Sequence, residues 1–386
     1  MHRQWLRRQT RRRRTSVIKT LWNRIKQPID PWLFLFTLLI FIVSAVVLYS
    51  ASNRDLEKVL DKVTFMGISL AVMWFFANIS QQTLMRLALP AYVVGVALLV
   101  AVALFGVTSH GATRWLNIGI TRIQPSELMR IAMPLMLAWY FHHFEASLNW
   151  KHFVVAGLLM VVPVGLILKQ PDLGTSLLIA SSGFYVLFLA GLSWRFLALM
   201  IAAGSGLAYT VTHWDLCINI LQEYQCRRVA TMLDPMQDPL GAGYHIIQGT
   251  IAIGSGGMLG KGWLNGTQTH LDFIPERTTD FIFAVFGEEF GLLGNGLLLV
   301  LYLLVIGRGL TIASRAPTLF GRLLAGAIAL NFFTYAFVNM GMVSGILPVV
   351  GVPLPLISYG GTSMVSILAT FGLMMSVSRD RKLMKG

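Results

Sequence analysis

The chain has 386 residues, of which 55% are hydrophobic and 12% are charged, and its net charge is +14. Ordinary soluble domains carry about 25% charged residues, so this composition excludes a typical soluble protein. A soluble all-α fold would also not need so many uncharged runs of membrane length, for which roughly 17 residues suffice. The composition therefore indicates a polytopic membrane protein.

The chain begins with a basic tail, residues 1–31, which contains Arg11–Arg14 and further cations. The apolar run after the tail is longer than that of a secretory signal, and no small-residue cleavage site follows it. Basic flanks of membrane helices stay in the cytoplasm, so we expect the tail there. Beside a membrane, anionic lipid headgroups explain its charge more simply than a nucleic acid, and no nucleic-acid partner is expected.

Ten candidate spans predict a single all-α transmembrane domain over residues 32–386. They cover residues 32–50, 63–79, 87–105, 125–142, 153–168, 174–192, 196–211, 281–306, 323–343 and 360–377. An even number of spans returns the basic C-terminus to the cytoplasmic side, in agreement with the positive-inside rule.

The longest connection, residues 212–280, lies between the seventh and eighth spans, and alternation of the spans makes it extracytoplasmic. Its apolar and aromatic residues and its Gly-rich turns predict a large ordered loop, with a helix-like stretch at 238–254. Cys217 and Cys226 both lie in this loop. An oxidising compartment would permit a disulfide between them, but their spacing also leaves two free thiols open.

Asp280 lies at the mouth of the eighth span. An aspartate there can cap the helix by accepting backbone N–H bonds. A carboxylate at a partly dehydrated interface can instead have a raised pKa and serve as a general base, and the two roles compete. Deeper in the span, Glu288 and Glu289 are functional candidates because ionisable groups are costly in a bilayer. At least one of them is expected to pair with a basic residue.

Glu127 and Arg130 are three residues apart in the fourth span, so they share a helix face and can neutralise each other. We expect an ion pair that lets the helix line a polar cavity, with direct substrate contact as the alternative. Asp172, in a short outer loop, either caps the next helix or belongs to the site.

Cations on the predicted outer face run against the positive-inside trend and suggest an anionic ligand such as phosphate or pyrophosphate. They are Arg114, Arg122, Arg227, Arg228 and Lys261. Ordinary surface charge is the alternative. The Gly-rich stretch 254–262 fails the phosphate-loop pattern, and we interpret it as a flexible turn whose amides could still bind an anion. The histidines show no metal-ligand spacing, so no protein metal cluster is predicted.

Six segments resemble the SEDS proteins (shape, elongation, division and sporulation). They are GATRWL at 111–116, QPSEL at 124–128, QPDLGT at 170–175, DPLGAGY at 238–244, PERTTDFIFA at 275–284 and ISYGGTS at 357–363. The similarity runs from about residue 32 to the C-terminus, and residues 271–277 look more like the RodA branch than the FtsW branch. Thr278 stands where the family usually has His, and Arg130 where it usually has Lys, whose hydrogen-bonding geometry differs.

The resemblance implies a peptidoglycan glycosyltransferase that polymerises lipid II during cell-wall elongation, with Asp280 as general base and undecaprenyl pyrophosphate as the leaving group. The residues expected to bind the substrates are Arg114, Glu127, Arg130, Asp172, Arg228, Lys261, Arg277 and Ser358. A divalent cation, Mg²⁺ or Mn²⁺, is expected as in the family, and no organic cofactor.

A class B penicillin-binding protein is the expected partner, because the chain has no transpeptidase domain of its own. The resemblance also implies the bacterial inner membrane, with both termini cytoplasmic and the active site on the periplasmic face. Two rival functions remain open. The first is a transporter that flips lipid II, although no internal repeat supports it. The second is a non-enzymatic scaffold for the penicillin-binding protein.

Overall fold

The computed structural model describes residues 28–109, 112–117, 122–212, 217, 223–241, 243–271 and 273–383. Most of the predicted basic tail and the last three residues lie outside these ranges, so the predictions made for them are not addressed by the structure. Within the described residues the chain is mostly helical, with one small antiparallel sheet.

Ten long helices in the described residues follow the ten predicted apolar runs. They are α2 (Pro31–Ala51), α3 (Leu56–Asn78), α4 (Gln81–Phe105), α5 (Pro125–His143), α6 (Trp150–Lys169), α7 (Leu173–Leu189), α8 (Trp194–Val211), α13 (Ile282–Ser314), α14 (Leu319–Val343) and α15 (Gly361–Leu383). Seven of these are long and apolar enough to cross a membrane, namely α2, α3, α4, α6, α13, α14 and the part of α15 up to Arg379. The chain is thus a multi-pass membrane protein, and the count of ten spans stays a prediction.

Most of the long helices begin at a residue that can accept a backbone N–H bond. The side chain of Asp30 caps α2, Asp55 caps α3 and Ser80 caps α4. Similar caps start α6, α7, α8 and α14. Because the first backbone N–H groups of a helix have no partner within the helix, these side chains fix where each apolar segment begins.

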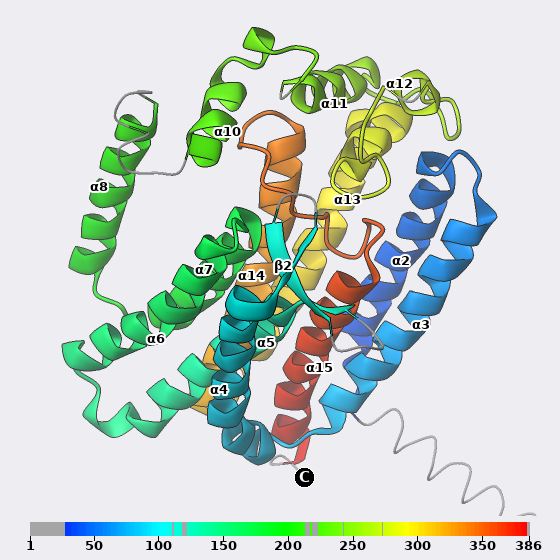
Figure 1. The fold of residues 1–386 in the computed structure, drawn as a ribbon. Helices are drawn as coiled ribbons and strands as arrows, with labels where there is room; N and C mark the ends of the chain where they lie inside the picture. The colour runs from blue at the N-terminus through cyan, green and yellow to red at the C-terminus, as the bar shows by residue number, and fades with distance from the viewer. Residues whose placement is uncertain are drawn as a thin grey trace, which may run out of the picture.

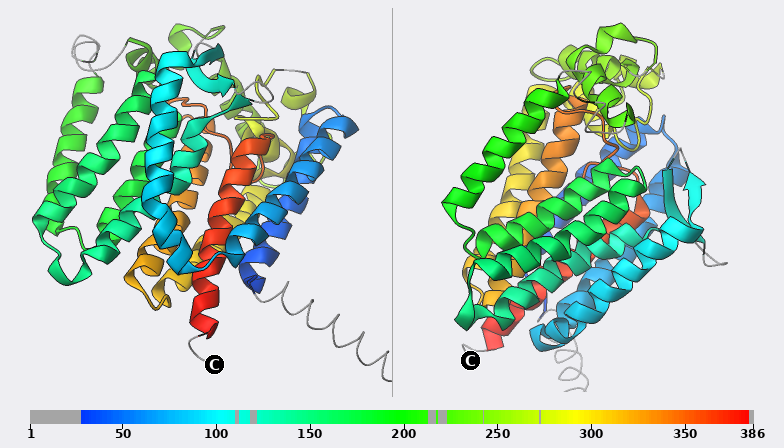
Figure 2. Two further views of the ribbon diagram at one scale, coloured as in Figure 1. Left: turned by 60° about the horizontal axis from the view of Figure 1, so that its bottom comes forward. Right: turned by 60° about the vertical axis from the view of Figure 1, so that its left-hand side comes forward.

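The long helices form one bundle, and the described chain starts and ends at the same end of it (Figure 1). Three short helices, α10 (Glu223–Leu233), α11 (Tyr244–Ser255) and α12 (Thr267–His270), lie at the opposite end, which we call the outer end (Figures 1 and 2). Of these, α11 and α12 contact α13. This arrangement is the one that alternating spans predict for the long connection between the seventh and eighth spans.

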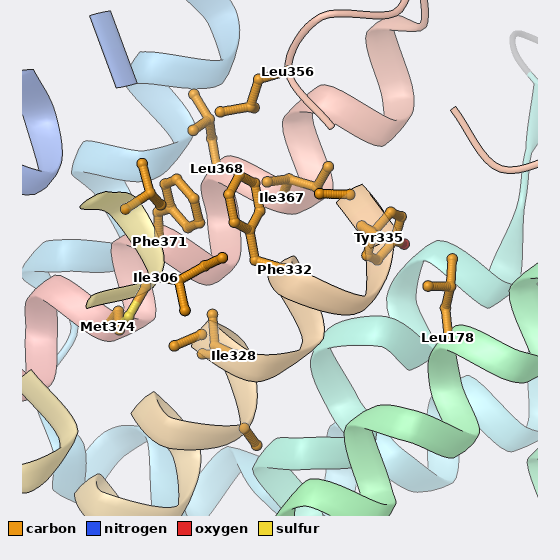
Figure 3. Close-up of a cluster of buried hydrophobic side chains, with 14 of the residues drawn as sticks. Leu178, Ile306, Ile328, Phe332, Tyr335, Leu356, Ile367, Leu368, Phe371 and Met374 are labelled. Carbon is orange, nitrogen blue, oxygen red and sulfur yellow. The ribbon is translucent and has the colours of Figure 1, made fainter. Parts of the chain in front are cut away.

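The interior of the bundle is apolar and aromatic. Figure 3 shows the Phe332 ring of α14 among Ile367, Leu368 and Phe371 of α15. The ring centroids of Phe332 and Phe371 are 5.2 Å apart in an edge-to-face arrangement, which aromatic pairs prefer. The helices α14 and α15 are therefore the buried centre that supports the loops at the outer end.

Three strands occupy the connection between α4 and α5, where the sequence predicted only a loop. They are β1 (Val107–Ser109), β2 (Ala112–Asn117) and β3 (Arg122–Ile123), in the antiparallel order β1-β2-β3. Val107 pairs with Trp115, and Leu116 pairs with Ile123. The strands are too short to show an alternating pattern, and they form because the backbone groups of β2 find partners on both sides.

The predicted eighth span is not one continuous helix. Gly291 has φ 62° and ψ −162° inside α13, which breaks the helix there. A Cβ at this position would stand 2.3 Å from the backbone nitrogen of Gly260, so only glycine fits. The Gly-rich stretch fills the break, since Leu292 N donates to Gly257 O (2.9 Å) and Leu293 N donates to Met258 O (3.1 Å).

The prediction that the Gly-rich stretch offers its amides to an anion is contradicted for the two amides nearest α13. Lys261 N donates to Glu288 O and Gly262 N donates to Glu289 O, each over 3.0 Å. A backbone N–H that already donates to a carbonyl is not free for a phosphate oxygen. The stretch therefore secures the break in α13 rather than forming a nest for an anion.

Cys217 and Cys226 are joined in a disulfide, with their Cα atoms 5.9 Å apart. This settles the alternative that their spacing left open. The bond crosses from residue 217 to α10, so it ties part of the long connection to the short helices at the outer end.

Helix α8 stands away from the rest of the bundle (Figure 1), and none of its described side chains is buried. A cavity of about 710 Å³ lies between it and helices α6 and α7, lined mainly by apolar side chains such as Phe153, Leu187 and Phe196. Apolar surface of this kind is compatible with lipid chains but not with water.

Candidate active site

Asp280 lies in the segment that leads into α13, and its side chain is half-buried. It does not cap the helix, because α13 begins at Ile282 after Phe281 and has no side-chain cap. No hydrogen bond to the Asp280 carboxylate occurs within the described part of the chain. The capping alternative is therefore not adopted, and the carboxylate remains available to an incoming group.

The charge state of Asp280 suits proton transfer near neutral pH. The pKa of this carboxyl is raised from 3.8 to about 6, mainly by burial and also by the nearby Glu276 carboxylate, while the Arg114 cation opposes the rise. A general base works best when its pKa lies near the working pH, because it is then both ionised and basic enough to accept a proton.

The backbone around Asp280 is held by residues of α14 and of the loop between α14 and α15. Tyr359 N donates to Thr278 O (2.8 Å), and Asn339 Nδ2 donates to Asp280 O (2.8 Å). Between them, Ser358 Oγ donates to Thr279 O (2.6 Å) and accepts from Leu354 N (2.7 Å). The predicted substrate-binding hydroxyl of Ser358 thus has two backbone partners, and substrate contact by it stays a prediction.

Arg114 reaches the site from β2, on the small sheet. Its Nε lies 3.5 Å from Asp172 Oδ2, and it also donates to Pro171 O over 3.4 Å. Asp172 caps α7, accepting from Thr175 N (3.1 Å) and Thr175 Oγ1 (2.9 Å). The capping role of Asp172 is confirmed, and the same carboxylate also pairs with Arg114, whose charge lowers the pKa of Asp280.

The predicted ion pair between Glu127 and Arg130 is present on α5, at 2.8 Å. Ser366 Oγ of α15 donates to Glu127 Oε2 (2.5 Å), and the Arg130 guanidinium lies 5.0 Å from the Tyr335 ring centroid. A buried cation needs both its counter-ion and further polar or aromatic contacts. The structural role of this pair is therefore observed, while substrate contact stays a prediction.

Lys261 pairs with Glu288, as predicted for at least one of the two glutamates of α13. Lys261 Nζ is 2.8 Å from Glu288 Oε1, and the Glu288 side chain is fully buried. The same carboxylate accepts from Gln268 N (2.9 Å) and Thr269 N (3.1 Å). Lys261 is hydrogen-bonded to Glu288 at 2.8 Å, whereas the pair between Arg114 and Asp172 is longer at 3.5 Å, so Lys261 is the weaker candidate for binding a phosphate group.

The remaining predicted cations lie on other parts of the outer end. Arg277 donates to the carbonyl of Thr269 over 2.8 Å, so part of its guanidinium is used within the chain. Arg228 lies on α10 and is half-buried. The side chain of Arg122 lies outside the described residues.

Two residues beside Asp280 were not singled out from the sequence. Glu276 is exposed, and its carboxylate accepts from Thr279 Oγ1 over 2.6 Å. His245 of α11 stacks near Phe281 with ring centroids 5.6 Å apart, and burial lowers the pKa of this imidazole. Glu276 is four residues before Asp280 in the same segment, whereas only the folded chain brings His245 against Phe281, the residue after Asp280.

Asn339 was also missed, although one signal pointed to it. It is one of two carboxamides in the largely apolar run 323–343, and polar groups in such runs are rarely accidental. No group of three or more His, Cys, Asp or Glu side chains that could hold a metal ion occurs among the residues the structure describes.

Comparison with known proteins places these residues in a family. The model of the FtsW, RodA and SpoVE family, described as a cell cycle protein, matches residues 30–383. The chain is 48% identical over 366 residues to the peptidoglycan glycosyltransferase MrdB of Escherichia coli strain K12, covering 95% of this chain and 97% of that protein. It is 33% identical over 349 residues to the peptidoglycan glycosyltransferase RodA of Treponema pallidum, and this match covers 73% of this chain and 81% of that protein.

Solved structures agree with this assignment. One is described as the structural coordination of polymerization and crosslinking by a peptidoglycan synthase complex. A chain of that structure matches this protein with a TM-score of 0.77 and 35% identity, and the match covers 91% of this chain and 98% of that chain. The rod shape determining protein RodA of Thermus thermophilus matches with a TM-score of 0.68 and 30% identity, and the match covers 91% of this chain and 97% of that chain.

Proposed function

Because the chain belongs to the FtsW, RodA and SpoVE family and is a peptidoglycan glycosyltransferase, we propose that Asp280 is the general base of its polymerisation reaction. The observation that carries the proposal is the state of this carboxylate. It is half-buried at the entrance of α13, it has no hydrogen-bond partner within the described residues, and its pKa is raised to about 6.

The acceptor is lipid II, and the donor is a growing glycan on undecaprenyl pyrophosphate. The 4-hydroxyl of the acceptor sugar attacks the anomeric carbon of the donor, and its proton passes to the Asp280 carboxylate. A new glycosidic C–O bond forms while the bond to the pyrophosphate oxygen breaks with inversion, and the electron pair leaves on undecaprenyl pyrophosphate. A positioned base contributes roughly 10²–10⁴-fold to such a step.

The leaving pyrophosphate needs cations, and Arg114 is the best placed of the predicted ones. Its positive charge lowers the pKa of Asp280, and its ion pair with Asp172 restrains the position of the guanidinium. Fixed charges that meet developing negative charge contribute at least as much as a general base in many enzymes. Arg228, Arg277, Lys261, Ser358 and the Glu127–Arg130 pair complete the proposed substrate-binding set.

A divalent cation, Mg²⁺ or Mn²⁺, is part of the proposal only as a companion of the substrate. The described residues offer no cluster of three or more ligating side chains, so they do not by themselves form a protein metal site. Mg²⁺ commonly binds through substrate phosphates and few protein ligands. No step above passes through such an ion.

The proposed partner is a class B penicillin-binding protein, which would supply cross-linking. A neighbouring structure is described as coordinating polymerization and crosslinking in one complex, which supports this proposal. We place both termini in the cytoplasm and Asp280 on the periplasmic face of the inner membrane. The described ends of the chain share one end of the bundle, and the short helices lie at the other (Figure 1), which is compatible with that orientation.

The test is glycan synthesis from lipid II by purified protein with its partner, with the strands resolved on a gel. Asp280→Asn should lower synthesis at least 100-fold, because the amide cannot accept the proton. Asp234→Asn is the matched control, since Asp234 is exposed and caps a short turn that asparagine caps equally well. Undiminished synthesis by the Asp280 variant would exclude the proposal, and lipid II translocation without chain growth in the parent protein would favour a flippase.

A further inference from the structure

The segment 278–280 has no regular secondary structure of its own to satisfy its backbone. Its three consecutive carbonyls instead accept hydrogen bonds from Tyr359 N, Ser358 Oγ and Asn339 Nδ2, at 2.8, 2.6 and 2.8 Å. Buried carbonyls need such donors, because an unpaired one costs about as much free energy as a lost hydrogen bond. The position of Asp280 is therefore set by groups that lie far away in the sequence.

Asn339 differs from the other two donors because its side chain bridges two separate backbone segments. Its Nδ2 donates to Asp280 O over 2.8 Å and to Val352 O over 2.7 Å, and the side chain is 0% exposed. Both neighbours are acceptors, so the carboxamide nitrogen must face them. The carboxamide oxygen Oδ1 has no hydrogen-bond partner among the described residues, so only the nitrogen of this buried amide is satisfied. A buried amide is costly in an apolar helix, and a leucine of similar size would avoid that cost.

The second segment that Asn339 holds is a wall of the site. Gly351 precedes Val352 and comes so close to Asp280 that a Cβ on it would lie 3.5 Å from Asp280 Oδ2. Asn339 thus holds the backbone of Asp280 on one side and the residue next to Gly351 on the other. Since the carboxylate has no hydrogen bond of its own in the described structure, its direction and its burial both depend on these two backbone segments.

From this geometry we infer that Asn339 is a positioning residue of the glycosyltransferase, one that aims the Asp280 carboxylate and keeps it shielded from water. The inference rests on the proposed role of Asp280 as general base. Asn339 acts through Asp280 and does not touch the substrate. Ser358 supports the same segment through the neighbouring carbonyl of Thr279.

The test compares Asn339→Leu with Asn331→Leu in the glycan synthesis assay. Asn331 lies two turns earlier on the same helix α14 and makes one side-chain hydrogen bond, from Ser181 Oγ over 3.0 Å. Asn339→Leu should lower kcat at least tenfold with KM for lipid II within twofold of the parent. It should also move the acidic limb of the pH profile to lower pH, because a released carboxylate gains water. Asn331→Leu should change neither quantity.

Ser358→Ala provides a second variant if Asn339→Leu does not fold, since it removes one hydroxyl and should shift kcat and the pH profile in the same direction by a smaller factor. A folded Asn339→Leu protein with the parent's kcat and pH profile would overturn the inference. Equal losses in the two asparagine variants would also overturn it, because the effect would then be a general one of α14. Activity in Asp280→Asn would instead refute the general-base proposal, so the two failures are distinguishable.

Discussion

Asp280→Asn should make the protein more stable at neutral pH while abolishing its activity. Burial raises the pKa of Asp280 from 3.8 to about 6, so the folded protein disfavours the ionised carboxylate. A carboxyl whose folded pKa exceeds its unfolded pKa contributes stability that is fully present below the unfolded value and is lost as the pH rises through the folded value. At about 1.4 kcal/mol per pH unit, the cost of ionised Asp280 above pH 6 is at most about 3 kcal/mol.

Asparagine carries no charge at any of these pH values and therefore avoids the cost. We expect the apparent Tm of the variant in detergent to exceed that of the parent by up to about 4 °C at pH 7.5. The gain should mostly disappear at pH 4, where Asp280 of the folded parent is protonated. Thermal unfolding at the two pH values measures this directly, with Asp234→Asn as the control for an exposed aspartate.

Two outcomes would refute the reasoning. One is an equal Tm for variant and parent at pH 7.5, which would mean that burial of Asp280 carries no electrostatic cost. The other is a gain in Tm that persists unchanged at pH 4, which would assign the stabilisation to packing rather than to charge. The expected result, an inactive but more stable protein, is the pattern of a site where function costs stability.

Two further predictions concern the pH dependence of the reaction and the ion pair on α5. Glycan synthesis should fall about tenfold for each pH unit below 6, because only the ionised Asp280 accepts a proton; rates between pH 5 and pH 8 at constant ionic strength measure this, and a flat profile would contradict it. Glu127→Ala should destabilise the fold by roughly 3–5 kcal/mol, since it leaves Arg130 buried without its counter-ion. The double variant Glu127→Leu/Arg130→Met should recover most of that stability in thermal unfolding, and failure to recover it would show that the cost does not come from the unpaired charge.

Much of the architecture could be predicted from the sequence because it depends on local properties. Whether a run such as 323–343 crosses a bilayer depends on the transfer free energy of its own side chains, and the observed helices follow the predicted runs closely. The placement of Asp280 at the start of the eighth span was predictable for the same reason. The resemblance of the segment 275–284 to a known family then pointed to its chemistry, and the family was confirmed.

Local properties could not predict the break in α13 at Gly291, because glycine also occurs within unbroken parts of the same helix, such as Gly287 and Gly296. The break is stable only because the stretch around Gly260 packs against it and supplies backbone partners. The strands between α4 and α5 were missed for a similar reason, since each is too short to carry a periodic signal.

By itself the sequence determined which segments are apolar, which outer residues carry charge and to which family the chain belongs. Only the tertiary structure decided how those charges are paired. Lys261 pairs with Glu288, Arg114 pairs with Asp172 and lowers the pKa of Asp280, and Asn339 holds the backbone of Asp280 from another helix. The physical reason is that each of these pairs joins residues far apart in the chain, and their energies depend on distance and burial, which exist only after folding.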